Sequence, residues 1–194
     1  MRKLLLATAV AVAAATGLPA VAAEAGTTRA VAAPYCGITW GSLLKQDPAM
    51  TQAPITNLRA GRHECFDRLV VDLGARPAGA PSQHAGYRVE YVSQVVQDGS
   101  GRPVPLAGGA FLSVVVHAPA HDIAGRPTYR PADPAHAVNV SGFSTFRQVA
   151  FAGTFEGSTT IGLGVRARLP FRVFLLSGPG SGSRLVIDVA HRRS

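Results

Sequence analysis

The chain has 194 residues, of which 47% are apolar, 7% are aromatic and only 15% are charged. This length predicts one domain, or one domain with a processed segment, and the low charge excludes both a disordered polyelectrolyte and a coiled coil. The 21 glycines and 14 prolines argue against a helical bundle.

Residues 1–23 have the layout of a secretory signal peptide. Arg2-Lys3 is a cationic start, residues 4–15 form an apolar run, and small residues occupy positions 20–23. A membrane anchor is the alternative, but the apolar run is shorter than the roughly 20 residues that span a bilayer. We therefore expect an exported chain, cleaved after Ala22 or Ala23, with no transmembrane segment after processing.

The net charge of the chain after this cleavage indicates which classes of binding partner to expect. The remaining residues include 17 basic and 11 acidic ones, which gives a net charge of +6. An exported basic protein meets anionic wall polymers or lipid headgroups. Export argues against nucleic acid as a partner, and the sequence shows neither a basic helix nor an aromatic platform that would bind it.

Residues 24–35 are rich in alanine, threonine and valine, and we expect them to form a flexible leader. The two cysteines that follow, Cys36 and Cys65, are expected to form a disulfide, because an exported chain reaches an oxidising compartment. Such a bridge would add about 3–4 kcal/mol of stability and hold the segment around Trp40 against a strand that begins near Phe66. A metal pair or a reactive thiol lacks the spacing of cysteines and histidines that it would need.

Short apolar runs separated by glycine and proline predict strands through the rest of the chain. The expected strands are residues 68–73, 87–92, 111–118, 143–152, 159–167, 171–176 and 184–190. Residues 41–46 fit at most a short helical turn, and residues 118–137 form a long loop. In the first strand Leu69 and Val71 share one face while Arg68 and Asp72 share the other. Seven strands of this kind predict an all-β fold, a β-sandwich with long Gly/Pro-rich loops or a closed curved sheet.

Two of these strands have nearly the same sequence. Residues 68–73 are Arg-Leu-Val-Val-Asp-Leu, and residues 184–189 are Arg-Leu-Val-Ile-Asp-Val. The repeat is either a coincidence between common strand patterns or the sign of two strands at equivalent places in two sheets. In both cases Asp72 and Asp188 are expected to pair with arginines on neighbouring strands.

Several segments of the chain resemble one family. They are Cys-Gly-Ile-Thr-Trp-Gly-Ser at 36–42, Arg-His-Glu-Cys-Phe-Asp-Arg-Leu-Val at 62–70, Gly-Tyr-Arg-Val-Glu-Tyr-Val at 86–92, and the stretch 146–174, with Thr-Thr-Ile-Gly-Leu-Gly-Val-Arg-Ala-Arg at 159–168. Together with the repeated hexapeptide they resemble the AMIN-like domain family of small secreted proteins from high-GC Gram-positive bacteria. The resemblance covers residues 36–191, which places an AMIN-like β domain at 36–192. It is thinner to the AMIN domain of N-acetylmuramoyl-L-alanine amidases.

This resemblance implies a β-sandwich at the cell surface in contact with peptidoglycan. It implies no catalysis, because the AMIN domain is the accessory part of those amidases, and it supplies no functional residues and no cofactor.

The search for catalytic or metal-binding residues gives weak candidates. His117 and His121, with Asp122 beside them, are four residues apart, a spacing that brings two metal ligands together only on a helix. Pro119 lies between the two histidines and disfavours a helix there, so no metal site is assigned. No serine lies in a nucleophile motif. The separations of the carboxylates Glu64, Asp67, Glu90 and Glu156 are not fixed by the sequence, so a pair for glycoside cleavage stays open.

Three arginines near the end of one predicted strand and in the next, Arg166, Arg168 and Arg172, form the candidate binding patch. They could contact phosphate or carboxylate groups of a wall polymer, or simply form a solvated strand face. The leading hypothesis is a non-catalytic, secreted, envelope-associated module that binds peptidoglycan or another anionic wall polymer. The alternatives are a secreted hydrolase that uses some of His117, His121, Asp122 and Glu156, and a module that binds another protein through a sheet edge or the strand 143–155.

Overall fold

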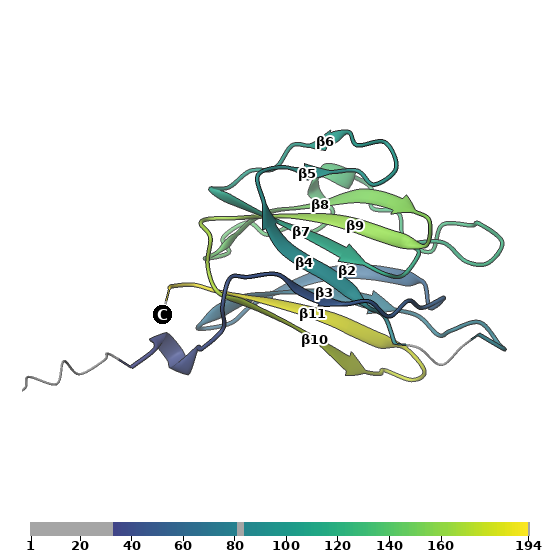
Figure 1. Cartoon of the computed structure of the whole chain (residues 1–194), viewed down its shortest axis with the longest axis horizontal. Coiled ribbons are helices and arrows are strands. Elements are labelled where there is room, and N and C mark those ends of the chain that lie inside the picture. The colour runs from purple at the N-terminus through teal and green to yellow at the C-terminus, as the bar shows by residue number, and fades with distance from the viewer. Residues whose placement is uncertain (1–32, 81–83, 194) are drawn as a thin grey trace, which may run out of the picture. The chain divides into compact units, whose positions relative to one another are not determined.

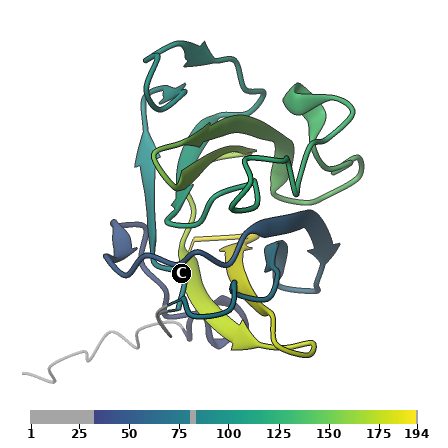
Figure 2. The ribbon, with the colours of Figure 1, turned by 90° about the vertical axis from the view of Figure 1, so that its right-hand side faces the viewer.

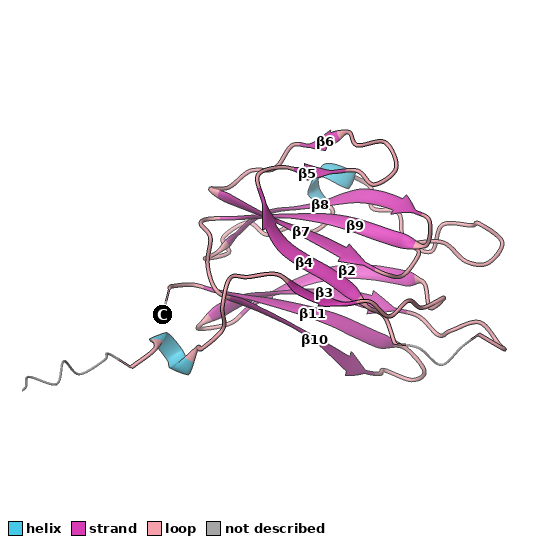
Figure 3. Ribbon diagram, viewed as in Figure 1, coloured by secondary structure: helices cyan, strands magenta, loops and turns pink. Residues whose placement is uncertain are grey.

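The computed structural model describes residues 33–80 and 84–193. The expected signal peptide, residues 1–23, and most of the expected leader lie outside the described residues. The elements are mostly strands (Figure 3), in the order η1 (Tyr35–Gly37), β1 (Lys45–Asp47), β2 (Ile55–Arg62), β3 (Phe66–Leu73), β4 (Tyr87–Val92), β5 (Val95–Val96), β6 (Pro103–Val104), β7 (Ala110–Val116), η2 (Pro134–His136), β8 (Phe146–Phe155), β9 (Ser158–Val165), β10 (Phe171–Ser177) and β11 (Ser183–Ala190).

Two antiparallel sheets form two layers (Figures 1 and 2). One sheet has five strands in the order β1-β4-β7-β9-β8, the other has four in the order β10-β11-β3-β2, and β5 pairs with β6 in a small ribbon. Alternate residues of both sheets point into one apolar core, which includes Leu69, Leu112, Ile161 and Ile187, each fully buried. The predicted β-sandwich is therefore confirmed, and so are all seven predicted strands, with bounds that shift by a few residues.

The sequence analysis missed some strands and misassigned one segment. It missed β2 because its only buried residues are Ile55 and Leu58, and a bulge follows Ile55, so the two-residue alternation is broken. The helical turn expected at residues 41–46 is wrong. Lys45 begins β1, which pairs with β4 at the edge of the five-stranded sheet, and the Gly41 carbonyl accepts a hydrogen bond from the main chain of Phe171 instead of one from its own segment.

The repeated hexapeptide belongs to two neighbouring strands of one sheet. The hypothesis that β3 and β11 occupy equivalent places in two sheets is wrong, because the two strands pair antiparallel with Val70 opposite Val186. The pattern is symmetric about these valines, so this register sets Arg68 opposite Asp188 and Asp72 opposite Arg184.

No helix in the described part of the chain is long and apolar enough to cross a membrane.

A candidate binding face of arginine and aromatic side chains

The four-stranded sheet turns one face to the core and carries arginines and aromatic rings on the other. Because side chains alternate along a strand, the side of β3 and β10 that faces away from the core carries two pairs, Phe66 with Arg68 and Arg172 with Phe174. Trp40, which precedes β1, packs on the same side with its ring centroid 5.6 Å from that of Phe66. We call this set, with Asp188 of β11 at its centre, the arginine–aromatic face.

The carboxylate of Asp188 binds two arginines at once. This carboxylate has no exposed surface and accepts hydrogen bonds from Arg68 Nε at 2.6 Å, Arg68 Nη2 at 2.9 Å and Arg172 Nε at 2.8 Å. The register explains the arrangement, since Arg172, Asp188 and Arg68 stand side by side on β10, β11 and β3. Two guanidinium groups share one carboxylate, so the cluster keeps a net positive charge.

The aromatic rings hold both guanidinium groups in place. The guanidinium carbon of Arg172 lies 4.4 Å from the ring centroid of Trp40 and 5.0 Å from that of Phe174. The guanidinium carbon of Arg68 lies 5.3 Å from the ring centroid of Phe66. Each such contact contributes about 0.5–2 kcal/mol, depending on how far it is removed from water. The arginines therefore occupy defined positions rather than moving freely in solvent.

The predicted disulfide is confirmed and fixes one side of this face. Cys36 and Cys65 are bonded at an S–S distance of 2.01 Å, with their Cα atoms 6.2 Å apart. Trp40 lies four residues beyond one cysteine, and Phe66 directly follows the other, which is the placement that the sequence predicted for the Trp40 segment.

The three predicted arginines lie at one end of the sandwich but have separate partners. Arg166 and Arg168 are not on a strand face; they follow β9, in the connection between the two sheets. Arg166 donates a hydrogen bond to the main-chain carbonyl of His191. Arg168 donates to the Ser42 carbonyl at 2.9 Å.

Arg168 and Arg172 both bind the Trp40–Ser42 segment, the first through Ser42 and the second through the Trp40 ring. The Arg172 side chain is 41% exposed, and its two terminal nitrogens form no hydrogen bond with any described residue. Arg172 therefore has donors left for an anionic group of a ligand.

Arg168 also contacts an aromatic ring. Its guanidinium carbon lies 5.0 Å from the ring centroid of Tyr91, whose pKa is raised chiefly by burial.

The aromatic members of the face were missed because the sequence does not show which strands are neighbours. The period of two places Phe66 beside Arg68 and Arg172 beside Phe174, and this signal was available. Only the register of β10, β11 and β3 joins the two pairs around Asp188.

The residues of the predicted alternatives have other partners. His117 Nδ1 lies 3.3 Å from Ser158 Oγ, and His121 Nδ1 lies 3.0 Å from the main-chain oxygen of Asp122. Hydrogen bonds from the main chain and side chain of Arg126 lower the pKa of Asp122. Within residues 33–80 and 84–193, no group of three or more histidine, cysteine or acidic residues could hold a metal ion.

Of the four carboxylates left open for glycoside cleavage, two are used within the fold. Asp67 is fully buried and accepts hydrogen bonds from the amides of Thr145 and Phe146. Glu90 forms an ion pair with Arg88 at 2.7 Å. Glu156 lies in the turn between β8 and β9, where it has a positive φ of 47°.

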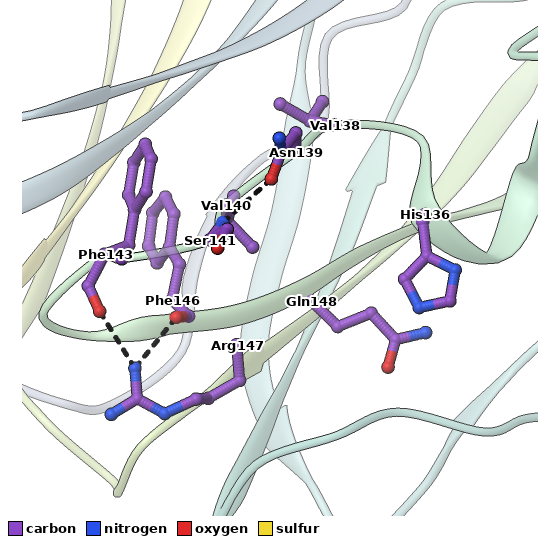
Figure 4. Close-up of a pocket in the computed structure, with 10 residues that line it drawn as sticks. His136, Val138, Asn139, Val140, Ser141, Phe143, Phe146, Arg147 and Gln148 are labelled. Atoms are coloured by element: carbon purple, nitrogen blue, oxygen red, sulfur yellow. Dashed lines mark hydrogen bonds between the residues drawn. The ribbon is translucent and has the colours of Figure 1, made fainter.

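A pocket lies beside β8 of the other sheet. It has a volume of about 660 Å³ and is bounded by residues 136–143 and the first residues of β8 (Figure 4). Aromatic, aliphatic and polar side chains line it, among them Phe143, Phe146 and Arg147.

Comparison with known families and proteins gives one match. The family model described as the AMIN-like domain matches residues 53–191. This range contains every residue of the arginine–aromatic face except Trp40 and begins after Cys36. No curated protein and no solved structure matches the chain.

Proposed function

The chain belongs to the AMIN-like domain family, and from this premise we propose that it is an exported, non-catalytic module that binds peptidoglycan or another anionic wall polymer. Family membership suggests a module associated with the cell wall, and the Cys36–Cys65 bond is consistent with a location outside the cytoplasm. We assign the arginine–aromatic face, together with Arg166 and Arg168, as the binding surface.

The observation that carries this proposal is the shared carboxylate of Asp188. Two arginines use one buried acidic partner, and Arg172 keeps two terminal nitrogens without a hydrogen-bond partner among the described residues. A guanidinium group fixed in this way can donate two parallel hydrogen bonds to a carboxylate or phosphate. The adjacent ring of Trp40 offers apolar surface for the carbon skeleton of a sugar. A polymer that combines sugar rings with anionic groups matches both features.

Sedimentation with purified wall sacculi tests the proposal. We expect the double variant Arg168→Gln, Arg172→Gln to bind about tenfold more weakly than the wild type, since each lost charge-assisted hydrogen bond is worth about 1.5–3 kcal/mol before screening. Binding by the wild type should also weaken as salt is added. Glutamine at position 172 keeps a hydrogen-bond donor near Asp188, and Arg68 still neutralises that carboxylate.

The matched control removes two positive charges elsewhere. Arg102 and Arg126 are exposed arginines outside the arginine–aromatic face, and the double variant Arg102→Gln, Arg126→Gln should leave sedimentation unchanged. Sacculi with and without their covalently attached anionic polymers separate peptidoglycan from those polymers as the ligand. Equal binding by wild type and double variant, with the fold verified by circular dichroism, would reject the arginine–aromatic face as the binding surface.

A further inference from the structure

The pocket beside β8 has the size and preorganised walls of a small-molecule site. Its volume of about 660 Å³ lies within the range of about 300–1,000 Å³ that is typical of ligand pockets. It is lined by residues that precede and begin β8, an edge strand of the five-stranded sheet, whereas the arginine–aromatic face lies on the four-stranded sheet. The two sites are therefore built from different elements.

A buried carboxylate fixes one wall of the pocket. Asp67 of β3 accepts hydrogen bonds from the amide of Thr145 at 2.6 Å and from the amide of Phe146 at 3.0 Å. Its other oxygen lies 3.1 Å from Nε2 of His191. An acidic group from the opposite sheet thus holds the main chain where the loop enters β8.

A buried amide fixes the other wall. Gln148 donates to the Ala135 carbonyl at 2.8 Å, and its side-chain oxygen accepts the amide of Ala107 at 2.7 Å. The side chain is thereby tied both to η2 and to the loop after β6. Because both walls are fixed by buried polar groups, a ligand would lose little free energy in ordering them.

The inner surface of the pocket combines an apolar floor with hydrogen-bond donors. Val140 and Phe146 are buried, and the rings of Phe143 and Phe146 are nearly parallel with centroids 5.9 Å apart. Nη1 of Arg147 donates to the carbonyls of Phe143 and Phe146 (Figure 4), and its Nη2 donates to that of Ser144. Its Nε is thus left without a partner among the described residues.

The remaining polar side chains of the pocket add further donors. The side-chain amide nitrogen of Asn139 and the hydroxyl of Ser141 donate no hydrogen bond to a described residue. The lining contains no aspartate or glutamate. The pocket therefore favours a ligand that brings hydrogen-bond acceptors and negative charge together with an apolar group.

We propose that this pocket is a second binding site, which takes an acylated amino acid with a free carboxylate. Arg147 binds the carboxylate of the ligand, and the floor of valine and phenylalanine side chains contacts its apolar side chain. Asn139 and Ser141 donate hydrogen bonds to its acyl oxygen. The same chemistry is offered by a free N-acyl amino acid and by the last residue of a peptide.

Titration of the isotopically labelled chain by nuclear magnetic resonance tests this site, with N-acetyl-L-valine and N-acetyl-L-valinamide as probes. We expect the acid to shift amide signals of residues 138–148 with a Kd of about 1 mM, a value suited to so small a ligand. The neutral amide should bind at least tenfold more weakly. Equal binding of the two probes, shifts outside residues 136–148 or no shifts at all would overturn the proposal.

Two variants at one position separate the charge from the fold. Arg147→Gln should remove the preference for the acid, whereas Arg147→Lys should keep most of it, since lysine retains the positive charge. If both variants bind the acid as the wild type does, Arg147 is not its ligand and the proposal fails. Arg102→Gln, which removes an exposed arginine outside the pocket, is the control and should leave both probes unaffected.

A tripeptide that ends in valine separates the two sources of the ligand. Tighter binding of the tripeptide than of N-acetyl-L-valine supports a peptide C-terminus, and equal binding supports a free N-acyl amino acid. Arg147→Gln should still sediment with sacculi, because Arg147 is not part of the arginine–aromatic face. Failure of this site is thereby distinguishable from failure of the proposed wall binding.

Discussion

Asp67 and Asp188 are the two carboxylates that the described residues bury completely, and each has partners that offset the cost of leaving water. Asp188 is balanced by two arginines, whereas Asp67 accepts two main-chain amides and lies against His191. Removal of one partner from such a cluster leaves the others unpaired, which is more costly than the loss of an exposed ion pair. The two acidic residues of the repeated hexapeptide provide a direct comparison, since Asp72 forms an exposed pair with Arg59.

Asp188→Asn should lower the free energy of unfolding by about 3 kcal/mol, because Arg68 and Arg172 lose their shared counter-charge. Asp72→Asn, at the matching position of the other copy, should cost less than about 1 kcal/mol. Urea unfolding followed by circular dichroism measures both losses. Equal losses would show that the burial of Asp188 does not set its contribution.

Asp47 predicts a dependence of stability on pH. Its pKa is lowered, first by a hydrogen bond from the Ala49 amide and then by His84. The ordinary pKa of an aspartate is 3.8, and a carboxyl group whose pKa is lower than this in the folded chain stabilises the fold at every pH above 3.8. This contribution is lost as the pH falls from 3.8 through the lower pKa of the folded state. The difference in unfolding free energy between wild type and Asp47→Asn should therefore shrink in that acidic range. A difference that stays constant with pH would contradict this assignment.

At the scale of elements, the strands that the sequence predicted are those with unbroken alternation, such as β3 and β10. The strands that it missed lack this signal, as in β2 with its bulge after Ile55. The glycines of β9 show a second limit. A Cβ atom at Gly164 would lie 2.0 Å from the Ala107 carbonyl oxygen, so the glycine is needed because a distant loop packs on the strand. Such a requirement depends on the tertiary structure and is not visible in the strand itself.

The disulfide joins the Trp40 segment to β3 and should affect both stability and the candidate face. Its cysteines are 29 positions apart, so the double variant Cys36→Ser, Cys65→Ser should lose about 3–4 kcal/mol of unfolding free energy. The chain has one tryptophan, Trp40, so a red shift in its emission should report the release of this segment from Phe66 and Arg172.

Urea unfolding and fluorescence of the oxidised chain, the reduced chain and the double variant measure these changes. The reduced wild type should behave as the variant does. An emission spectrum that is identical in all three would mean that the segment stays in place without the bond, held by the contacts of Gly41 and Ser42.

At the scale of the whole domain, the fold class followed from the sequence, but the sites did not. Alternating strands with one apolar face must cover each other, which gives the sandwich whatever the strand order. The arginine–aromatic face needs the order β10-β11-β3, and the pocket needs Asp67 of one sheet to bind the start of β8 in the other. Of the three arginines proposed from the sequence, only Arg172 belongs to this face, because β10 pairs with β11 so that Arg172 stands opposite Asp188.

The symmetric charges of the repeated hexapeptide also restrict how β3 and β11 can align. A shift of β11 by two residues would keep its apolar side chains toward the core, so the hydrophobic effect alone penalises such a slip weakly. The same shift would move Asp188 from Arg68 to Val70, an aliphatic residue, and would move Arg184 from Asp72 to Gly74, which lies just past the end of β3. The duplicated sequence therefore selects a single alignment from those that the leucines, isoleucine and valines alone would tolerate.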